Sequence, residues 1–339
     1  MTTPQVVINA VAYELPADII SSADIEAQLA PTLERLQIGA GILEALTGIR
    51  ERRFWPPGTM PSDVATRAAR QVIAKSGVAP DDLGCLISTS VCKDYIEPSV
   101  ASLVHGNLEL PSTCMNFDIG NACLGFLNGI STVARMIQAG EIDHGMVVDG
   151  EDARHAVETT IQRLGSPDTT AEAFRDNFAT LTLGSGAVAM VLSRRDLATG
   201  GHRLNGAVTR AATEHCRLCL GQPDYMVADA GKVLFHGVEL AYETWQAAGN
   251  TLANWNDEAI DLYVPHQVSQ RNMDALYRRL AITPEKFQLN FYTLGNIGPA
   301  ALPITLAQAE EQGRTPVGAH VALLGIGSGL NCSMMSVTW

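Results

Sequence analysis

The stretch Asp82-Leu83-Gly84-Cys85-Leu86-Ile87-Ser88 decides the organisation of this chain, because its pattern occurs a second time. Residues 258–264 (EAIDLYV) also follow a long helical pattern and run from acidic into apolar residues, at an offset of 176 (258 − 82). Residues 146–150 (MVVDG) and 321–325 (VALLG) repeat at an offset of 175 (321 − 146). Two matches at nearly one offset, with a helical pattern between them in each half, favour a duplicated unit over a chance likeness of apolar strands.

The rest of the chain alternates strand and helix patterns, which predicts an α/β fold. We expect strands at residues 6–12, 85–90, 114–119, 145–149, 186–192, 204–210, 262–264, 320–324 and 332–337. We expect helices at residues 63–75, 99–107, 122–138, 231–248, 270–280 and 299–311. The duplication divides the chain into two halves, residues 1–178 and residues 179–339.

Composition excludes several classes of protein. The 339 residues are 46% hydrophobic and 17% charged, as in a globular protein with much buried surface. No run of about 18 apolar residues is present, so no membrane span is expected. A net charge of −13 argues against nucleic-acid binding. Seven scattered cysteines indicate reduced thiols, and the first seven residues lack signal-peptide features, so we predict a cytoplasmic protein.

Residues 118–129 pass from an apolar strand through small residues into a helix, with Cys123 in the first helical turn. Unpaired backbone N–H groups and the positive end of the helix dipole favour a thiolate at such a position. The same N–H groups could stabilise an oxyanion on a substrate attached to the sulfur. A buried structural cysteine is the alternative, and this segment alone does not decide between the two.

Three further motifs could carry chemistry, and each has a structural alternative. His266 lies at the tip of an apolar strand, where a satisfied structural histidine is the commoner case. Asn296 lies in a tight turn before a helix that Pro299 can start, and turn asparagines usually cap locally. Ser328 lies in a glycine loop that no helix follows, so the loop is not a phosphate loop, but its backbone amides could face a thioester carbonyl.

The duplication places these four residues at the ends of corresponding elements, where α/β proteins build their sites. A thiol, two side-chain donors and exposed backbone amides form a set that suits acyl transfer through an S-acyl intermediate. The residues alone therefore favour a cysteine acyltransferase.

The motifs Thr47-Gly48-Ile49-Arg50-Glu51-Arg52, Asn121-Ala122-Cys123, Val264-Pro265-His266-Gln267 and Gly295-Asn296 fall in the order and approximate spacing of the thiolase superfamily. Over nearly its full length the chain resembles the ketoacyl synthase III-like enzymes of that superfamily. The resemblance implies a duplicated thiolase fold, a five-layer αβαβα sandwich, usually in a homodimer.

The same resemblance implies the roles of the four residues. Cys123 would be the acylated nucleophile. His266 and Asn296 would donate hydrogen bonds to the thioester oxygen of the second substrate. The backbone amides of Cys123 and Ser328 would form the other oxyanion hole.

Within this family, residues 89–99, 121–124, 148–151 and 324–333 resemble the head-to-head acyl-CoA thiolases of long-chain olefin biosynthesis. Glu97 separates two chemistries. A malonyl thioester forms its carbanion by losing carbon dioxide, whereas a simple acyl thioester must lose an α-proton to a base. The resemblance implies that Glu97 reaches across a dimer and supplies that base. On the residues alone, Glu97 is an exposed glutamate before Pro98 that caps the following helix.

The predicted activity is non-decarboxylative Claisen condensation of two medium- or long-chain fatty acyl-CoAs to a 2-alkyl-3-oxoacyl product. No metal or redox cofactor is expected, since the coenzyme A thioesters are substrates. The resemblance implies a homodimer and downstream enzymes that process the β-keto acid product. Decarboxylating condensation with a malonyl thioester, of the 3-oxoacyl-ACP synthase III type, is the alternative. A catalytically silent acyl-binding scaffold is a third possibility, against which the intact cysteine, histidine and asparagine argue.

Some positions depart from the ketoacyl synthase III pattern. Ile42 and Leu46 stand where that family has the tryptophan and arginine that clamp the coenzyme A nucleotide, so coenzyme A and acyl-carrier-protein donors both remain open. Arg50, Arg52 and Arg53 form a basic cluster that is expected to be a solvated charge run rather than a donor site.

For segment 154–177 and the remaining cysteines we predict structural roles. The polar, helical segment 154–177 is assigned to an acyl tunnel or to the dimer. Cys216 and Cys219 have the C-x-x-C spacing, but no second ligand pair follows, so ordinary thiols are expected. Cys85, Cys92, Cys114 and Cys332 lie in or beside apolar strands and are interpreted as packing residues.

Overall fold

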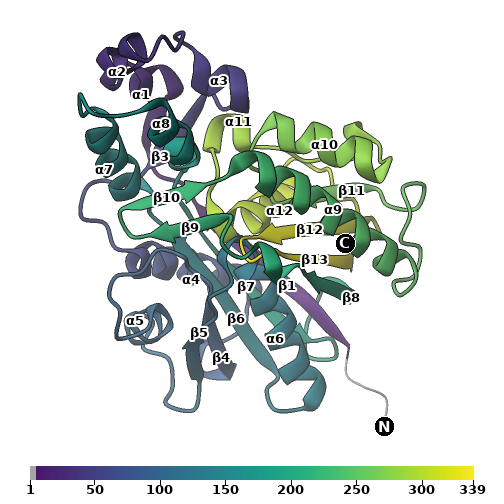
Figure 1. The fold of residues 1–339 in the computed structure, drawn as a ribbon. Helices are drawn as coiled ribbons and strands as arrows, with labels where there is room; N and C mark the ends of the chain where they lie inside the picture. The colour runs from purple at the N-terminus through teal and green to yellow at the C-terminus, as the bar shows by residue number, and fades with distance from the viewer. Residues whose placement is uncertain (1–4) are drawn as a thin grey trace.

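A computed structural model describes residues 5–339 and contains, within that range, a mixed sheet of nine strands (Figure 1). The strand order is β11-β12-β13-β8-β1-β7-β6-β4-β5. Its strands are β1 (Val6–Glu14), β4 (Leu83–Ser88), β5 (Met115–Asp118), β6 (His144–Glu151), β7 (Gly186–Arg194), β8 (His202–Ala211), β11 (Leu262–Pro265), β12 (His320–Gly327) and β13 (Asn331–Thr338). Two small two-stranded sheets are separate from it, β2 (Asp18–Ser21) with β3 (Glu51–Phe54) and the hairpin of β9 (Cys219–Gln222) with β10 (Tyr225–Ala228).

The two halves of the large sheet repeat one pairing pattern. β4 runs parallel to β6, β6 antiparallel to β7, and β7 antiparallel to β1. In the same way β11 runs parallel to β12, β12 antiparallel to β13, and β13 antiparallel to β8. The halves meet where β1 pairs with β8 over two residues. An isolated parallel bridge between Tyr263 and Phe287 stands where the first half has β5.

Twelve α-helices lie in the described range. They are α1 (Ser22–Gln28), α2 (Ala30–Arg35), α3 (Ile42–Thr47), α4 (Pro61–Ser76), α5 (Val100–Asn107), α6 (Gly125–Ala139), α7 (Arg154–Leu164), α8 (Ala171–Asn177), α9 (Ala230–Gly249), α10 (Gln270–Leu280), α11 (Phe291–Leu294) and α12 (Ala301–Glu311). Helix α4 shows how local sequence sets such bounds, since Pro61 occupies its first turn and Gly77 ends it with φ +69°.

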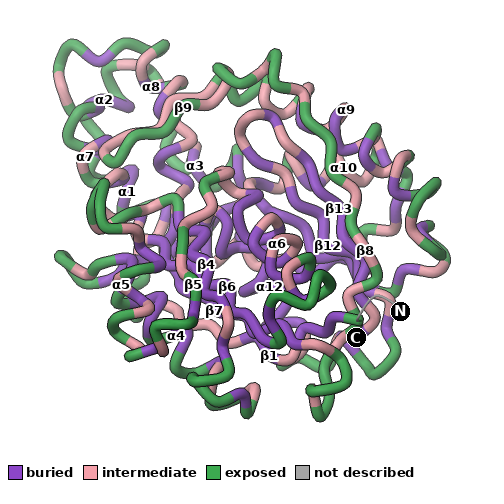
Figure 2. The backbone as a smooth tube through the Cα atoms, turned by 90° about the horizontal axis from the view of Figure 1, so that it is seen from below, coloured by how far each residue is buried: buried purple, intermediate pink, exposed green. Residues whose placement is uncertain are grey.

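Three hydrophobic clusters relate the helices to the sheet. Helices α6 and α12 share one cluster with one face of both halves of the sheet. Helices α4 and α5 pack against the other face of the first half, and α9 and α10 against the other face of the second. Because strand side chains alternate between faces, strands covered on both sides become apolar throughout. Figure 2 shows the result, with the buried residues gathered along the strands at the centre of the molecule.

The predicted α/β class and the nine strands of the large sheet are confirmed, and the six predicted helices are present with bounds shifted by a few residues. Short elements outside the two repeats were not predicted, notably β2, β3, β9 and β10. Their four-residue strands are too short for a periodic signal. No helix in residues 5–339 has the length and apolar character needed to cross a membrane. Residues 1–4, part of the segment examined for a signal peptide, lie outside the described residues.

Candidate active site

The structure brings four of the predicted site residues to one cavity of about 190 Å³. Cys123, His266, Asn296 and Ser328 all line it, although they lie on four separate segments of the chain. The remaining walls are mostly apolar and come from α9, α10, the hairpin β9–β10 and the ends of β12 and β13. Among them are Met226, Val233, Leu234, Val238, Met273, Leu276, Ile326 and Met334. An apolar cavity with a few convergent polar groups is the usual form of a ligand site.

Cys123 lies in a single 3₁₀ turn, Ala122–Leu124, directly before α6. Ala122 has a positive φ of 45°, an uncommon conformation for a residue with a side chain, which turns the chain sharply before the cysteine. Gly327 at the end of β12 packs on this turn. A Cβ at Gly327 would lie 3.0 Å from the backbone nitrogen of Leu124 and 3.3 Å from that of Cys123. Glycine is therefore required for the close approach of strand and turn.

A chain of amide side chains fixes the same turn from the other side. Asn331 donates to the Oδ1 atom of Asn121 at 3.1 Å, and Asn121 donates to the Oδ1 atom of Asn128 at 2.7 Å. Asn121 immediately precedes Ala122, so these bonds connect β13 and α6 to the turn that holds Cys123.

The electrostatics of Cys123 differ from the sequence prediction of a stabilised thiolate. Burial raises the pKa of the Cys123 thiol to about 12, and the Cys219 thiol and the Glu151 carboxyl add to the rise. Desolvation disfavours the charged form more strongly than one turn of N–H groups favours it. The Cys123 side chain is therefore a neutral thiol at pH 7.

His266 follows β11 and is 5% exposed. Burial lowers the pKa of its imidazole to about 4, so the ring is neutral at pH 7. Its backbone N–H donates to the Leu324 carbonyl at 2.8 Å, which aligns it with β12. The Nδ1 atom is buried and has no hydrogen-bond partner within residues 5–339. A proton placed on Nδ1 would be a buried donor without an acceptor, so we assign it to Nε2.

The loop after His266 is fixed by the side chain of Gln267. Its Oε1 atom accepts the backbone N–H groups of Asn290 and Phe291, and its Nε2 atom donates to Thr305 at 2.9 Å. These bonds connect the histidine loop to the segment that leads into Asn296.

In the Asn296 side chain, the oxygen already accepts a hydrogen bond, whereas the nitrogen has no partner among the described residues. Its Oδ1 atom accepts the backbone N–H of Gly298 at 3.0 Å, which fixes which end is the oxygen. Its backbone N–H donates to Thr182, and its carbonyl accepts from Gly184. The side-chain Nδ2 atom makes no hydrogen bond to any described residue and remains available to a ligand in the cavity.

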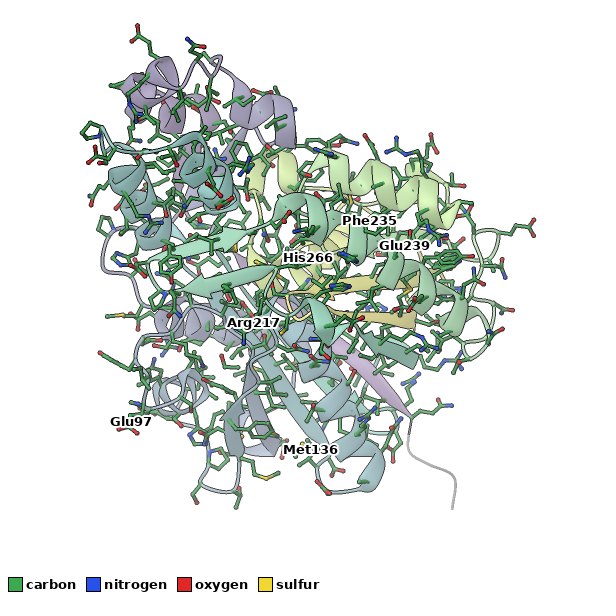
Figure 3. All side chains as sticks on the ribbon, viewed as in Figure 1. Glu97, Met136, Arg217, Phe235, Glu239 and His266 are labelled. Atoms are coloured by element: carbon green, nitrogen blue, oxygen red, sulfur yellow. The ribbon has the colours of Figure 1, made fainter. Side chains whose placement is uncertain are left out.

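Glu97 is not among the residues that line this cavity. In Figure 3 its label is at the lower left, whereas that of His266 is near the centre. The glutamate is exposed, on the segment between β4 and α5. The chain that carries the cysteine therefore does not supply this carboxylate to its own cavity.

The structure corrects the prediction for the arginine cluster. Arg50 is exposed, but Arg52 is 1% exposed and donates to the Ser22 hydroxyl and the Leu181 carbonyl. Burial lowers the pKa of Arg52 to about 10. The Cβ of Arg52 lies 3.2 Å from a Cβ built at Gly295, so this side chain supports the turn that holds Asn296 and does not form part of a solvated run.

Segment 154–177 and Cys219 differ from their predicted places relative to the cavity. Segment 154–177 forms α7 and α8, as predicted helical, but none of its residues, all described, lines the cavity. Cys219 does line the cavity, beside Cys123, although its C-x-x-C spacing suggested only an ordinary thiol. No sequence signal marks this, because the hairpin β9–β10 reaches the site only through tertiary packing. Within residues 5–339 no cluster of three His, Cys, Asp or Glu side chains could hold a metal ion.

Comparison with known proteins shows the family to which the chain belongs. Residues 117–211 match the family model of 3-oxoacyl-[acyl-carrier-protein] synthase III, and residues 251–339 match the model of its C-terminal part. The chain is 46% identical to an acyl-CoA:acyl-CoA alkyltransferase of Xanthomonas campestris pv. campestris, over 94% of each chain. It is 41% identical to the acyl-CoA:acyl-CoA alkyltransferase of Shewanella oneidensis, over the whole of both chains.

A solved structure extends the likeness to three dimensions. A cysteine-to-serine variant of Xanthomonas campestris OleA with bound lauric acid and lauroyl-CoA superposes with a TM-score of 0.97 at 44% identity, over 100% of both chains. The fold and the cysteine, histidine and asparagine site define a condensing acyltransferase, and the chain belongs to the 3-oxoacyl-ACP synthase III family of the thiolase superfamily. Within that family it groups with the acyl-CoA:acyl-CoA alkyltransferases.

Proposed function

We propose that this protein joins two medium- or long-chain fatty acyl-CoAs head to head, without decarboxylation, through an S-acyl intermediate on Cys123. The observation that carries the proposal is one apolar cavity that a thiol, a neutral imidazole and a free amide N–H all line. Two acyl-CoA:acyl-CoA alkyltransferases at 41% and 46% identity, and a relative with bound lauroyl-CoA, support the choice of substrate.

In the first half-reaction the Cys123 sulfur attacks the carbonyl carbon of an acyl-CoA. The sulfur–carbon bond forms, the bond to coenzyme A breaks, and the cysteine proton passes to the departing thiolate. Because the Cys123 thiol and the His266 ring are both neutral at rest, charge appears only during attack. The backbone amides of Cys123 and Ser328 are our candidates for stabilising the oxyanion that then forms, since both residues line the cavity.

In the second half-reaction another acyl-CoA places its thioester oxygen between the Nε2–H of His266 and the Nδ2–H of Asn296. Both donors are neutral and fixed in position, so they stabilise the enolate oxygen without reorganising. A carboxylate removes the α-proton, and the resulting carbanion attacks the acyl-Cys123 carbonyl. The cysteine leaves with a proton, and a 2-alkyl-3-oxoacyl-CoA forms, which hydrolysis converts to the β-keto acid.

We infer that Glu97 of a second copy supplies that carboxylate in a homodimer. The support is the surface around it, where apolar side chains are exposed on the glutamate segment and on the neighbouring edge strand β5. They are Val91, Tyr95, Ile96, Met115 and Phe117. Exposed apolar groups gathered at a sheet edge are typical of a protein interface.

We also propose that the chain has the duplicated thiolase fold, a sandwich of five layers, αβαβα. Its support is the arrangement of the clusters, with α6 and α12 between the two halves of the sheet and the pairs α4–α5 and α9–α10 outside. The predicted division at 178/179 stays a prediction. The strand pairing favours a later boundary, between Arg194 and His202, because β7 completes the first repeat.

Incubation with myristoyl-CoA alone, followed by mass spectrometry of protein and extracted products, tests the activity. A β-keto acid with twice the carbons of myristate, or the ketone left by its decarboxylation, supports non-decarboxylative condensation. Acylated Cys123 without condensed product would support the decarboxylating alternative, which addition of malonyl-CoA would then reveal. No acyl group on Cys123 would favour a silent scaffold.

A mixed dimer tests the origin of the carboxylate. Cys123→Ala lacks the nucleophile and Glu97→Gln lacks the base, so each homodimer is expected to be inactive in condensation. A heterodimer with one chain of each kind contains one site with both groups only if Glu97 acts across the interface. Recovered condensation in the mixture supports the proposal, and its absence in a verified heterodimer contradicts it.

A further inference from the structure

Two buried carboxyl groups take no part in the mechanism above. Asp149 and Glu151 lie two residues apart on β6, so their side chains project from the same face of the strand. Asp149 is fully buried and Glu151 is 4% exposed. No ion pair among residues 5–339 involves either one. Unpaired buried carboxyls are costly, and their retention needs a reason.

The Glu151 carboxyl group contacts the segment that carries Glu97. Its Oε1 atom accepts the backbone N–H of Val91 at 2.6 Å, and its Oε2 atom accepts that of Cys92 at 3.2 Å. Both oxygens therefore serve as acceptors for the first residues of the glutamate segment. An ionised carboxylate accepts at both oxygens, whereas a protonated acid or an amide places a donor at one of them.

The turn that holds Asn296 lies next to the same carboxyl group. A Cβ at Gly298 would lie 3.7 Å from the Cδ atom of Glu151, and Gly298 has a positive φ of 56°. The N–H of Gly298 is the donor that fixes the Oδ1 atom of Asn296. One carboxyl group thus lies next to the asparagine turn and accepts hydrogen bonds from the start of the glutamate segment.

The Asp149 carboxyl group lies beside that of Glu151. Its Oδ2 atom accepts from the Thr89 hydroxyl at 2.5 Å, while Oδ1 has no other partner in the described residues. Burial and the neighbouring Glu151 raise the pKa of Asp149 well above its ordinary value. Burial also raises the pKa of Glu151, and the N–H groups of Val91 and Cys92 oppose that rise. The proton that the pair holds therefore lies more on Asp149 than on Glu151.

We propose that Glu151 is a positioning residue that connects the Glu97 segment to the Asn296 turn. Its carboxylate would then help to position two groups, the Asn296 donor of the protomer's own site and the Glu97 base that acts in the partner's site. The proposal rests on the proposed function for Glu97. Other bonds, such as those of Asp94 to Ser62 and Lys93 to Asp118, fix the middle of the segment, but neither connects it to the catalytic turn.

Glu151→Gln tests the proposal with almost no change of volume. Its amide group would face one of the two N–H donors, so the segment should shift while the asparagine turn keeps its packing. We expect acylation of Cys123 by myristoyl-CoA within about twofold of wild type, and condensation reduced about tenfold, the effect of a displacement well under 1 Å. Asp152→Asn is the matched control, because its carboxyl group bonds Ser185 and the Arg154 N–H and not the glutamate segment, and both rates should stay unchanged.

A parallel fall of acylation and condensation in Glu151→Gln, or no change in either, would overturn the proposal. Val91→Pro removes one of the two donors without altering the buried pair, and covers the case in which Glu151→Gln does not fold. If the two residues act through one bond, the double variant should lose no more condensation than the worse single variant.

Amide hydrogen exchange separates this inference from the proposed function. Residues 91–98 should exchange faster in Glu151→Gln than in wild type, whatever reaction the enzyme performs. Unchanged exchange there refutes the connection itself. The proposed role of Glu97 is refuted if the wild-type protein never condenses acyl-CoA, or if Glu97→Gln condenses it normally. If exchange is nevertheless faster in Glu151→Gln, the connection made by Glu151 is a structural contact only.

Discussion

Gly327→Ala is expected to slow acylation of Cys123 more than it lowers stability. The added Cβ would lie 3.0 Å from the Leu124 nitrogen and 3.3 Å from the Cys123 nitrogen, where ordinary contact begins at 3.4 Å. The atoms in the way belong to backbone, so the nucleophile turn must move by about 0.4 Å. Since a misplacement of about 1 Å can cost about 100-fold in rate, we expect acylation to fall by roughly five- to tenfold.

Gly325→Ala on the same strand is the matched control. Its added Cβ would lie 2.5 Å from the Cδ1 atom of Leu127 and 2.6 Å from that of Leu124, the far ends of two flexible side chains. We expect it to cost about 1–3 kcal/mol of stability through overpacking and to change acylation little.

The assay is the rate at which myristoyl-CoA acylates Cys123, followed by intact-protein mass spectrometry, with urea unfolding of both variants. Wild-type acylation in Gly327→Ala would refute the claim that this contact positions the nucleophile. Equal losses of acylation in the two variants would show that general disruption of β12, and not the contact with the turn, is responsible.

Three shorter predictions follow from the same geometry. His266 binds its proton less tightly when folded, with a pKa of about 4. Stability should fall as the pH drops below about 6.5, and wild type should lose about 2 kcal/mol more than His266→Asn between pH 7 and 5 in urea unfolding. Gln267→Ala leaves the N–H groups of Asn290 and Phe291 without an acceptor and should cost about 2–4 kcal/mol, read by the same method; a cost under 0.5 kcal/mol would contradict the role given to this side chain. Ile96→Asp places a charge at the most exposed apolar residue of the glutamate segment, and should shift a dimer toward monomer in analytical ultracentrifugation and abolish condensation; an unchanged dimer would argue for a different interface.

Much of the site could be found from sequence because its signals are local. Cys123, His266, Asn296 and Ser328 each follow an apolar strand or lie in a glycine-containing turn, and such punctuation can be recognised without knowing what packs against it. The repeat at offsets of 176 and 175 then placed the segments at corresponding ends of a duplicated sheet. In the structure all four line one cavity.

Electrostatic properties could not be predicted in the same way. A helix start after a strand indicates N–H groups near Cys123, but the pKa of the thiol depends on how completely the surrounding walls exclude water. Arg52 illustrates the same limit. Its charged neighbours in the sequence predict a solvated cluster, but the fold buries this arginine.

The sequence by itself determined the α/β class, the duplication and the identities of the groups at the strand ends, because periods of 2 and 3.6 residues and turn chemistry are encoded locally. Only the tertiary structure decided that Cys219 lines the cavity beside Cys123, that Glu97 lies outside the cavity of its own chain, and that Glu151 accepts the backbone N–H groups of Val91 and Cys92. Each of these depends on contacts between segments far apart in the chain, and on the water that those contacts exclude.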